Sequence, residues 1–340
     1  MSTPSALGPL FALAVLALGV TARAAGLEDD QRFQQSQRHM GAKFEVIFYA
    51  PNAAAADLAF EAVFDRVKEL DQMMSDYDPE SELSRLSKAS PTSQPRSVSR
   101  ELRDVLAQAQ SLSRRTDGAF DVTVGPLTRL WRRARRQKKM PDPSRLDEAR
   151  RAVGYELMLV DFESSKVALR RPRMCLDLGG IAKGYAADAM LEVLKGRRID
   201  RALVNAGGDV VVSGAPPGQI GWKVEIAPLG ESESPSEFLM LSNAGVATSG
   251  DAWQSVEIDG VRYSHIVDPH TGLGTTRRGG VTVVANDGTT SDSLASALNV
   301  MDIDAGLQLV DQISGASAFI VWEADGKLHE RRSRSFPARQ

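Results

Sequence analysis

Cysteine is almost absent from this 340-residue sequence, which contains Cys175 and no other. A single cysteine excludes an internal disulfide, so the stability of the fold has to come from a buried core. Because Cys175 lies in an apolar stretch, we expect a packed thiol and not a nucleophile. Histidine is also scarce, and a multi-histidine zinc site is not predicted; the four histidines are His39, His265, His270 and His329.

An excess of positive charge is missing as well. The chain has 44 acidic and 41 basic residues and a formal net charge of −3. Proteins that bind nucleic acids usually present a strongly basic face, so this composition argues against a nucleic-acid partner. Basic residues do gather between positions 129 and 139, around Trp131. We expect a solvated helix face there, with contact to an acidic partner protein as the alternative.

The sequence also lacks a hydrophobic run long enough to span a bilayer comfortably. The apolar segment 7–20 is broken by two glycines and a proline, and Ala22-Arg23-Ala24 follows it. Small residues at this spacing are typical of a signal cleavage site. We therefore predict a signal peptide over residues 1–25 and an exported, periplasmic protein that is soluble after cleavage. No Lys or Arg precedes the apolar segment, so a tether by an uncleaved N-terminal segment is the alternative.

The block from Asp177 to Asp188 is the most informative part of the sequence for a binding site. An apolar segment, 174–176, predicts a strand before it, and the apolar spacing after it predicts a helix. Gly179 and Gly180 at this junction would let the backbone approach a ligand closely, and the first N–H groups of the helix would face an anion. Lys183 adds a positive charge one turn into the helix. A tight turn with a surface lysine explains the same residues.

Three further blocks follow in a fixed order, at 205–209, 263–272 and 291–296, and two precede, at 74–77 and 116–127. They have the sequences NAGGD, YSHIVDPHTG, SDSLAS, MSDY and TDGAFDVTVGPL. Together with DLGGIAKGYAAD they resemble the bacterial ApbE family of FAD:protein FMN transferases. The resemblance covers about residues 38 to 325. It implies one flavin transferase domain over residues 26–340.

The resemblance also implies a Mg²⁺ site. Asp292 and Ser296 are four residues apart, so a helix capped by Thr290 or Ser291 would place their oxygens on one face. The residues alone leave simple helix capping and metal binding both open. By resemblance, Asp292, Ser296 and the carbonyl of Gly180 are the metal ligands. Ser296 stands where the family usually has threonine, and the hydroxyl is kept.

His265 lies at the end of a predicted strand and is followed by Asp-Pro-His-Thr-Gly, which is not typical of a packed core histidine. The resemblance makes it the catalytic base. It further implies FAD contacts at Met40, Tyr77, Ala119, Phe120, Asp121, Asp177, Lys183 and Ile266. Tyr77 is equally consistent with a surface tyrosine, and residues 119–121 with a plain turn after a helix. His270 replaces an arginine that is common in the family, which puts a phosphate contact there in doubt.

The activity implied by the resemblance is transfer of the FMN moiety of FAD to a threonine of an acceptor protein, with Mg²⁺ and release of AMP. The expected acceptor is a subunit of a membrane redox complex. Two other functions fit the same residues. One is a Mg²⁺-dependent FAD hydrolase that forms FMN and AMP, and the other is an exported FAD-binding protein without activity.

Outside the blocks, strand and helix patterns are mixed. Residues 43–49 alternate as in a strand, Asn52 can cap the helix that follows, and residues 99–115 have helical spacing. The Asp-Gly pair at 259–260 predicts a hairpin, the Gly-Gly pair at 207–208 a bulge or a close approach, and the Ser-rich segment 87–97 a loop. We therefore predict an α+β fold with largely antiparallel sheets, packed helices and a ligand cleft between sheet and helices.

Overall fold

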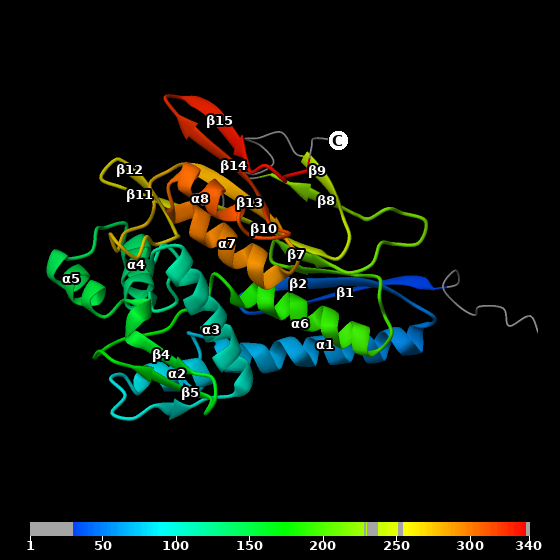
Figure 1. Cartoon of the computed structure of the whole chain (residues 1–340), viewed down its shortest axis with the longest axis horizontal. Helices are drawn as coiled ribbons and strands as arrows, with labels where there is room; N and C mark the ends of the chain where they lie inside the picture. The colour runs from blue at the N-terminus through cyan, green and yellow to red at the C-terminus, as the bar shows by residue number, and fades with distance from the viewer. Residues whose placement is uncertain (1–29, 228, 230–236, 251–253, 338–340) are drawn as a thin grey trace, which may run out of the picture.

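The fold is built around one eight-stranded antiparallel sheet (Figure 1). The computed structural model describes residues 30–227, 229, 237–250 and 254–337. The strand order is β1-β2-β6-β7-β10-β13-β14-β15. The bounds are Gln31–His39 (β1), Ala42–Ala50 (β2), Ala202–Ala206 (β6), Asp209–Val212 (β7), Ala244–Gly250 (β10), Gly279–Ala285 (β13), Ser317–Ala324 (β14) and Lys327–Arg332 (β15). The predicted α+β class with antiparallel pairing is confirmed.

One face of this sheet packs against helices. They are α1 (Ala53–Met74), α6 (Ala182–Gly196), α7 (Gly288–Val300) and α8 (Ile303–Val310), and α3 (Arg100–Arg115) and the short α2 (Glu82–Lys88) complete the core on this side. The alternation of β2 turns Phe44, Val46 and Phe48 into the core, where Phe48 meets Phe60 of α1 at 4.6 Å between ring centroids. Asn52 caps α1 as predicted, since its side chain accepts a hydrogen bond from the Ala55 N–H.

The other face carries a second apolar cluster. A two-stranded ribbon, β8 (Trp222–Ile226) with β9 (Glu237–Leu241), covers alternate residues of the central strands, including Val210, Val212 and Phe319. Since Val211 faces the helices while Val210 and Val212 face the ribbon, the middle strands are buried on both sides. A separate small sheet joins β3 (Arg96–Ser97), β5 (Lys166–Leu169) and β4 (Met158–Asp161), with a 3₁₀ turn at Tyr155–Leu157.

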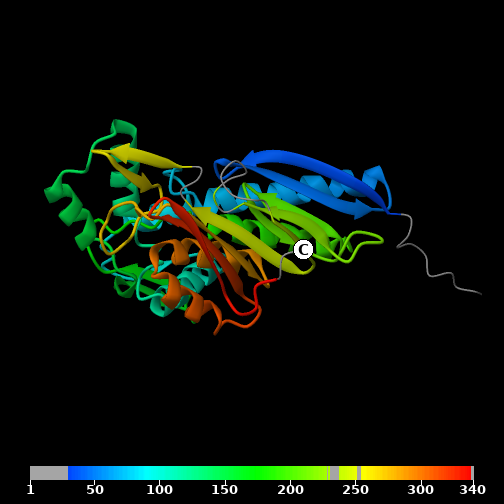
Figure 2. The same ribbon diagram turned by 90° about the horizontal axis from the view of Figure 1, so that it is seen from above.

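A third cluster holds an outlying part of the molecule. It contains α4 (Gly125–Gln137), α5 (Pro143–Arg151) and the hairpin β11 (Ser255–Ile258) and β12 (Val261–Ser264). Asp259 and Gly260 have φ values of +52° and +76°, as the predicted Asp-Gly turn requires. Figures 1 and 2 both show this part at one end of the molecule and the β1–β2 hairpin at the other.

Several predicted local structures are wrong. Residues 174–176 form no strand, because their N–H groups bond to Ser90 and Ser87 hydroxyls and only Cys175 makes an isolated bridge. The Gly-Gly pair at 207–208 is the turn of the β6–β7 hairpin and not a bulge, but the alternative prediction of a close approach is confirmed, since a Cβ atom on Gly207 would lie 2.6 Å from Ala42 Cβ. Asp287, not Thr290 or Ser291, caps α7. The segment 87–97 is a loop over residues 89–95 as predicted, and only its ends differ, where α2 finishes and the short strand β3 lies.

The predicted signal peptide and anchor lie outside the described residues. Among the residues that the structure does describe, no helix combines the length and the apolar character needed to cross a membrane.

Candidate functional site

The glycine pair before α6 lies against the middle of α7. A Cβ atom on Gly180 would come within 2.9 Å of Ser296 Oγ and 3.3 Å of the Phe120 ring, so a larger residue would displace them. Asp292 lies one turn before Ser296, and its Oδ2 accepts a hydrogen bond of 3.0 Å from the Gly184 N–H. The structure therefore brings Gly180, Asp292 and Ser296 together, although they come from two distant parts of the sequence.

Close contact of α6 with α7 fixes this arrangement. A Cβ atom on Gly184 would lie only 2.1 Å from the Gly288 carbonyl oxygen. Asp188, one turn further along α6, accepts hydrogen bonds from the Gly288 and Thr289 N–H groups and from the Thr289 hydroxyl, at 2.7, 2.8 and 2.6 Å. These bonds satisfy N–H groups that have no partner within α7. The start of α7 is thus held in register with α6.

Negative charge exceeds positive charge around Asp292. Burial and the charge of Asp209 raise the pKa of Asp292 to about 7, against the opposing effects of Lys183 and the Gly184 N–H. Lys183 forms an ion pair with Asp209. Burial alone would lower the pKa of Lys183, but Asp209 and Asp292 raise it overall, so the lysine stays protonated. Two buried carboxylates therefore share one ammonium group, and a bound cation would offset the remaining negative charge.

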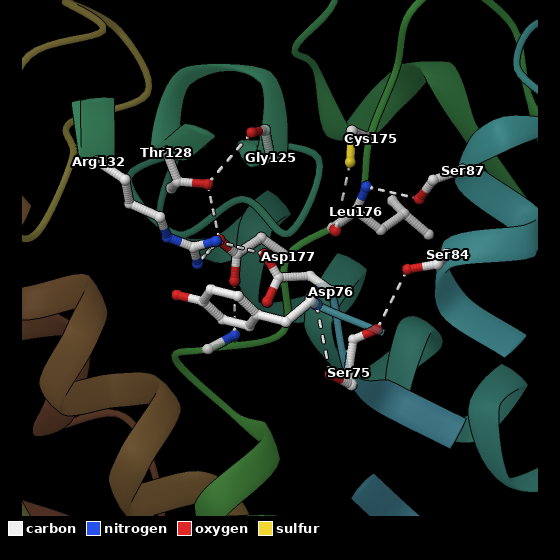
Figure 3. Close-up of polar contacts among 12 residues, drawn as sticks. Ser75, Asp76, Ser84, Ser87, Gly125, Thr128, Arg132, Cys175, Leu176 and Asp177 are labelled. Carbon is white, nitrogen blue, oxygen red and sulfur yellow. Dashed lines mark hydrogen bonds and ion pairs between the residues drawn. The ribbon is translucent and has the colours of Figure 1, made fainter. Parts of the chain in front are cut away.

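A second polar group surrounds Asp177 (Figure 3). Asp177 Oδ2 accepts hydrogen bonds from Arg132 Nη2 at 2.9 Å and from the Thr128 hydroxyl at 2.7 Å, while its Oδ1 accepts from the Gly179 N–H at 2.9 Å. Arg132 Nη1 also donates to Asp76 Oδ2 at 2.6 Å, so the guanidinium bridges two buried carboxylates. The Asp177 carboxylate holds the segment before the glycine pair in place.

Tyr77 lies at the edge of this group. The Arg132 guanidinium carbon is 4.4 Å from the centroid of its ring, and the residue is 75% exposed. Burial and the charge of Asp177 raise the pKa of the neighbouring Asp76. Tyr77 is therefore a surface tyrosine by exposure, yet its ring is held by the same guanidinium that orients Asp177. Both predicted FAD contacts are thus tied to one side chain, Arg132.

Ala119, Phe120 and Asp121 are buried immediately after the turn that ends α3. Asp117 and Gly118 in this turn have φ values of +49° and +78°. Asp121 Oδ1 accepts hydrogen bonds from the N–H and the hydroxyl of Thr123, each at 2.7 Å, and burial raises the pKa of Asp121. The predicted turn is present, and it places Phe120 beside Gly180.

His265 and Ile266 follow β12. The His265 N–H donates to the Gln254 carbonyl at 2.9 Å, and the Ile266 carbonyl accepts from the Thr275 N–H at 2.9 Å. The Ile266 N–H donates to the Ser264 hydroxyl at 3.1 Å. These bonds fix the backbone at the end of the hairpin. His265 therefore follows a strand directly, as the sequence predicted.

Helix α4 connects this hairpin with the Asp177 group. Trp131 Nε1–H donates to the Ser264 carbonyl at 2.9 Å, and the Trp131 and Tyr263 rings meet edge to face at 5.4 Å. The next residue, Arg132, contacts Asp177. Two consecutive residues of one helix thereby link the strand end that carries His265 to the segment before the glycine pair.

Met40 lies in the turn between β1 and β2. Its φ is +49°, and its N–H donates to Asp71 Oδ2 of α1 at 3.0 Å. The side chain packs against the main core. The position of this predicted FAD contact is therefore fixed by a bond to α1.

Two cavities lie next to these groups. The larger, about 1430 Å³, runs along α3, α6 and α7 and is lined by Tyr185 and Asp188 among others. The smaller, about 570 Å³, is lined by Asp121 and His270 among others. His270 Nε2 lies 2.8 Å from the Asp117 carbonyl oxygen, so its ring is tied to the turn after α3. A ligand cleft between sheet and helices stays a prediction.

Comparison with known proteins finds similarity over most of the chain, including all of the sequence blocks described above. The family model described as "ApbE family" matches residues 40–320. The FAD:protein FMN transferase of Vibrio cholerae serotype O1 is 33% identical over 304 residues, which cover 87% of this chain and 89% of that protein. The FAD:protein FMN transferase of Haemophilus influenzae is 29% identical over 310 residues, with coverage of 88% and 89%.

Solved structures of ApbE proteins have the same fold as this chain. The flavin transferase ApbE from Vibrio cholerae superposes with a TM-score of 0.81 at 29% identity, covering 90% of this chain and 98% of that one. The apo form of Pseudomonas stutzeri flavinyl transferase ApbE superposes with a TM-score of 0.79 at 27% identity, covering 90% and 95%. Fold and sequence thus define a protein of the flavin transferase type. The chain belongs to the ApbE family.

Proposed function

We propose that this protein is an FAD:protein FMN transferase that attaches FMN to a threonine hydroxyl of an acceptor protein and releases AMP. The observation that supports this most directly is the meeting of Gly180, Asp292 and Ser296 at the start of α6, within a chain of the ApbE family. FAD is the donor substrate. Met40, Tyr77, Ala119, Phe120, Asp121, Asp177, Lys183 and Ile266 are the residues that we propose for its binding.

The residues present fit a Mg²⁺ ion. Asp292, Ser296 and the Gly180 carbonyl offer three oxygens, which suits a cation that keeps several waters and phosphate oxygens in its coordination shell. Burial and the charge of Asp209 raise the pKa of Asp292, so a cation beside this carboxylate would stabilise its charged form. Mg²⁺ held there would neutralise charge on the diphosphate of FAD.

The chain supplies further groups for the diphosphate. Lys183 lies in the first turn of α6 and stays protonated between two carboxylates. The first N–H groups of a helix favour an anion. Asp209 orients the lysine through their ion pair. FAD phosphates would thus be held by Lys183 and by the backbone around Gly179 and Gly180.

His265 is the proposed base. The imidazole takes the proton of the threonine hydroxyl, for which its ordinary pKa of about 6.5 is suited near neutral pH. The hydroxyl oxygen attacks the FMN phosphorus and a new P–O bond forms. The bond from this phosphorus to the bridging oxygen breaks, and AMP leaves with that oxygen and its electron pair. The proton is then released from His265 to solvent.

The place of action follows from the predicted signal peptide. We propose that the protein works in the periplasm, with a subunit of a membrane redox complex as acceptor. The N-terminal segment is either cleaved or retained as a tether.

The decisive experiment combines the purified protein with FAD, Mg²⁺ and a threonine-bearing acceptor. Flavin fluorescence that survives a denaturing gel measures transfer. Asp292→Asn should lower transfer at least 100-fold and weaken Mg²⁺ binding measured by calorimetry, because the charged ligand is lost. Asp304→Asn, an exposed carboxylate on α8, is the matched control and should leave both unchanged. Full transfer by Asp292→Asn would refute the metal assignment.

His265→Ala tests the base separately. Transfer should fall while the affinity for FAD is kept, because the imidazole acts on the acceptor hydroxyl. An unchanged transfer rate would remove His265 from the mechanism. AMP release at the same rate without acceptor would instead identify the protein as an FAD hydrolase, and tight FAD binding without AMP release would identify a flavin-binding protein.

A further inference from the structure

The outward surface of α4 is strongly basic. Between Asp121 and Asp142 the sequence contains no acidic residue. Five basic side chains of this stretch are exposed, and none of them forms an ion pair within the described part of the chain, although the charge of Arg129 acts on the nearby Asp76. We call these residues the basic face of α4: Arg129, Arg133, Arg136, Lys138 and Lys139.

The basic face follows from helix periodicity. Arg129, Arg133 and Arg136 recur at steps of four and three residues and form one stripe, opposite the buried stripe of Leu127, Trp131 and Ala134. Like charges at these spacings repel each other along the helix. The opposite stripe anchors the helix, so the charges stay side by side on a rigid support. A negatively charged partner would relieve the repulsion.

The basic face borders the proposed reaction centre. Trp131 of α4 donates a hydrogen bond to Ser264, the residue before His265, and Arg132 contacts Asp177. A protein acceptor has to bring its hydroxyl within hydrogen-bond distance of His265. Such an acceptor must cover part of the surface around the β11–β12 hairpin. Because α4 packs on this hairpin through its buried stripe, the basic face lies on the far side of the same helix, about one helix diameter (roughly 10 Å) from the hairpin, where an extended acceptor segment would reach it.

We infer that the basic face of α4 docks an acidic segment of the acceptor protein. This inference rests on the proposed function, since it assumes a protein acceptor at His265. An acidic polypeptide fits better than a nucleic acid or an anionic membrane, because the basic face is small and the whole chain carries a net charge of −3. Contacts between exposed charges act mainly on the association rate and on the choice of partner, and salt weakens them.

Fluorescein-labelled peptides test the docking directly. One peptide has a central threonine flanked by aspartates, and its counterpart has lysines instead. We expect the wild-type protein to bind the acidic peptide, with at least tenfold weaker binding at 300 mM than at 50 mM salt by anisotropy. Arg133→Glu with Arg136→Glu should weaken binding at least tenfold. The variant Arg133→Lys with Arg136→Lys keeps the positive charge and should bind the acidic peptide as the wild-type protein does.

A matched charge reversal controls for the change in net charge. Lys195 and Arg197 lie at the C-terminal end of α6. At a rise of 1.5 Å per residue, this end is about 20 Å from the start of the helix. The double variant Lys195→Glu with Arg197→Glu should therefore bind the acidic peptide within twofold of wild type. An equal loss in this control, or binding within twofold of wild type in Arg133→Glu with Arg136→Glu, would overturn the docking. So would a loss of binding to phosphatidylglycerol vesicles with peptide binding unchanged.

Transfer to the acidic peptide separates the two proposals. If FMN is transferred but charge reversal on α4 changes neither binding nor KM for the peptide, the docking is refuted while the proposed function stands. If the peptide binds through the basic face but receives no FMN from FAD and Mg²⁺, the docking stands and the transfer chemistry fails. The affinity for FAD should be the same in all α4 variants.

Discussion

Replacement of Arg132 by glutamine tests the connection between Tyr77 and Asp177. The guanidinium donates to Asp76 and Asp177, whose side chains are only 10% and 6% exposed, and lies over the Tyr77 ring. Glutamine is similar in length but has no charge and cannot span both carboxylates. Two carboxylates would then face each other without the cation that bridges them, and only the more distant charge of Arg129 would oppose their repulsion.

The expected loss of stability follows from these contacts. Each hydrogen bond to a charged group contributes about 1.5–3 kcal/mol when buried. The Arg132 side chain is 31% exposed, so solvent screening places both bonds near the lower value. With about 0.5 kcal/mol for the cation over an exposed ring, the sum is roughly 3–4 kcal/mol. For a chain of this length, that corresponds to a fall in the melting temperature of about 5 °C.

The loss should depend on pH in a defined direction. Burial and the charge of Asp177 already raise the pKa of Asp76 above its value in the unfolded chain. A carboxyl group of this kind binds a proton more tightly in the folded state, so stability falls as pH rises through its folded pKa. Without Arg132 the pKa of Asp76 rises further. The difference from wild type should therefore be larger at pH 8 than at pH 5.

Calorimetric melting of the FAD-free protein at both pH values measures this difference. Arg133→Gln, the next residue on the same helix and an exposed one, is the matched control and should change the free energy of unfolding by less than about 0.5 kcal/mol. A melting temperature of Arg132→Gln within 1 °C of wild type at pH 8 would show that the bridge does not stabilise the fold. Weaker FAD binding should accompany the loss of stability.

Three further changes have defined outcomes. Gly184→Ala should destabilise the protein by roughly 3 kcal/mol in chemical denaturation, because its Cβ would overlap the Gly288 carbonyl oxygen; wild-type stability would mean that α6 and α7 can separate freely. Ser296→Ala should lower the rate of FMN transfer about tenfold at limiting Mg²⁺, while Ser296→Thr should keep the wild-type rate. Equal transfer rates of the two variants would exclude a role for the hydroxyl. Cys175 should not react with a thiol reagent at pH 8 until the protein unfolds, because it is buried and burial raises its pKa; rapid reaction in the native state would contradict its packing.

Local patterns predicted the elements that depend on neighbouring residues. The cap at Asn52, the helix over 99–115 and the Asp-Gly hairpin are all encoded within a few positions. Two edge strands, β1 and β15, were missed because most of their residues are polar and exposed, so they show no alternation. The segment 174–176 looked like a strand, but distant serine hydroxyls take the place of a partner strand.

In the candidate site, too, local spacing predicted some features, while contacts between distant residues could not be predicted from it. The spacing of Asp292 and Ser296 predicted that they share a helix face, whereas the closeness of this face to Gly180 and Gly184 was implied by family resemblance and not by any local pattern. Arg132 was missed because its carboxylate partners lie 45 and 56 residues away in the sequence. Its helical spacing from Thr128 is a signal that could have separated it from the exposed arginines of the same run.

The two ends of the molecule have a practical meaning for how the protein is handled. β1 begins at Gln31 at the end opposite α4, α5 and the β11–β12 hairpin in both views (Figures 1 and 2). An affinity tag or a biosensor linkage placed ahead of this strand would turn the arginine-rich end toward the solution. Immobilisation through that side would leave the surface open to incoming polypeptides, whereas coupling through surface lysines would modify Lys138 and Lys139 and block it.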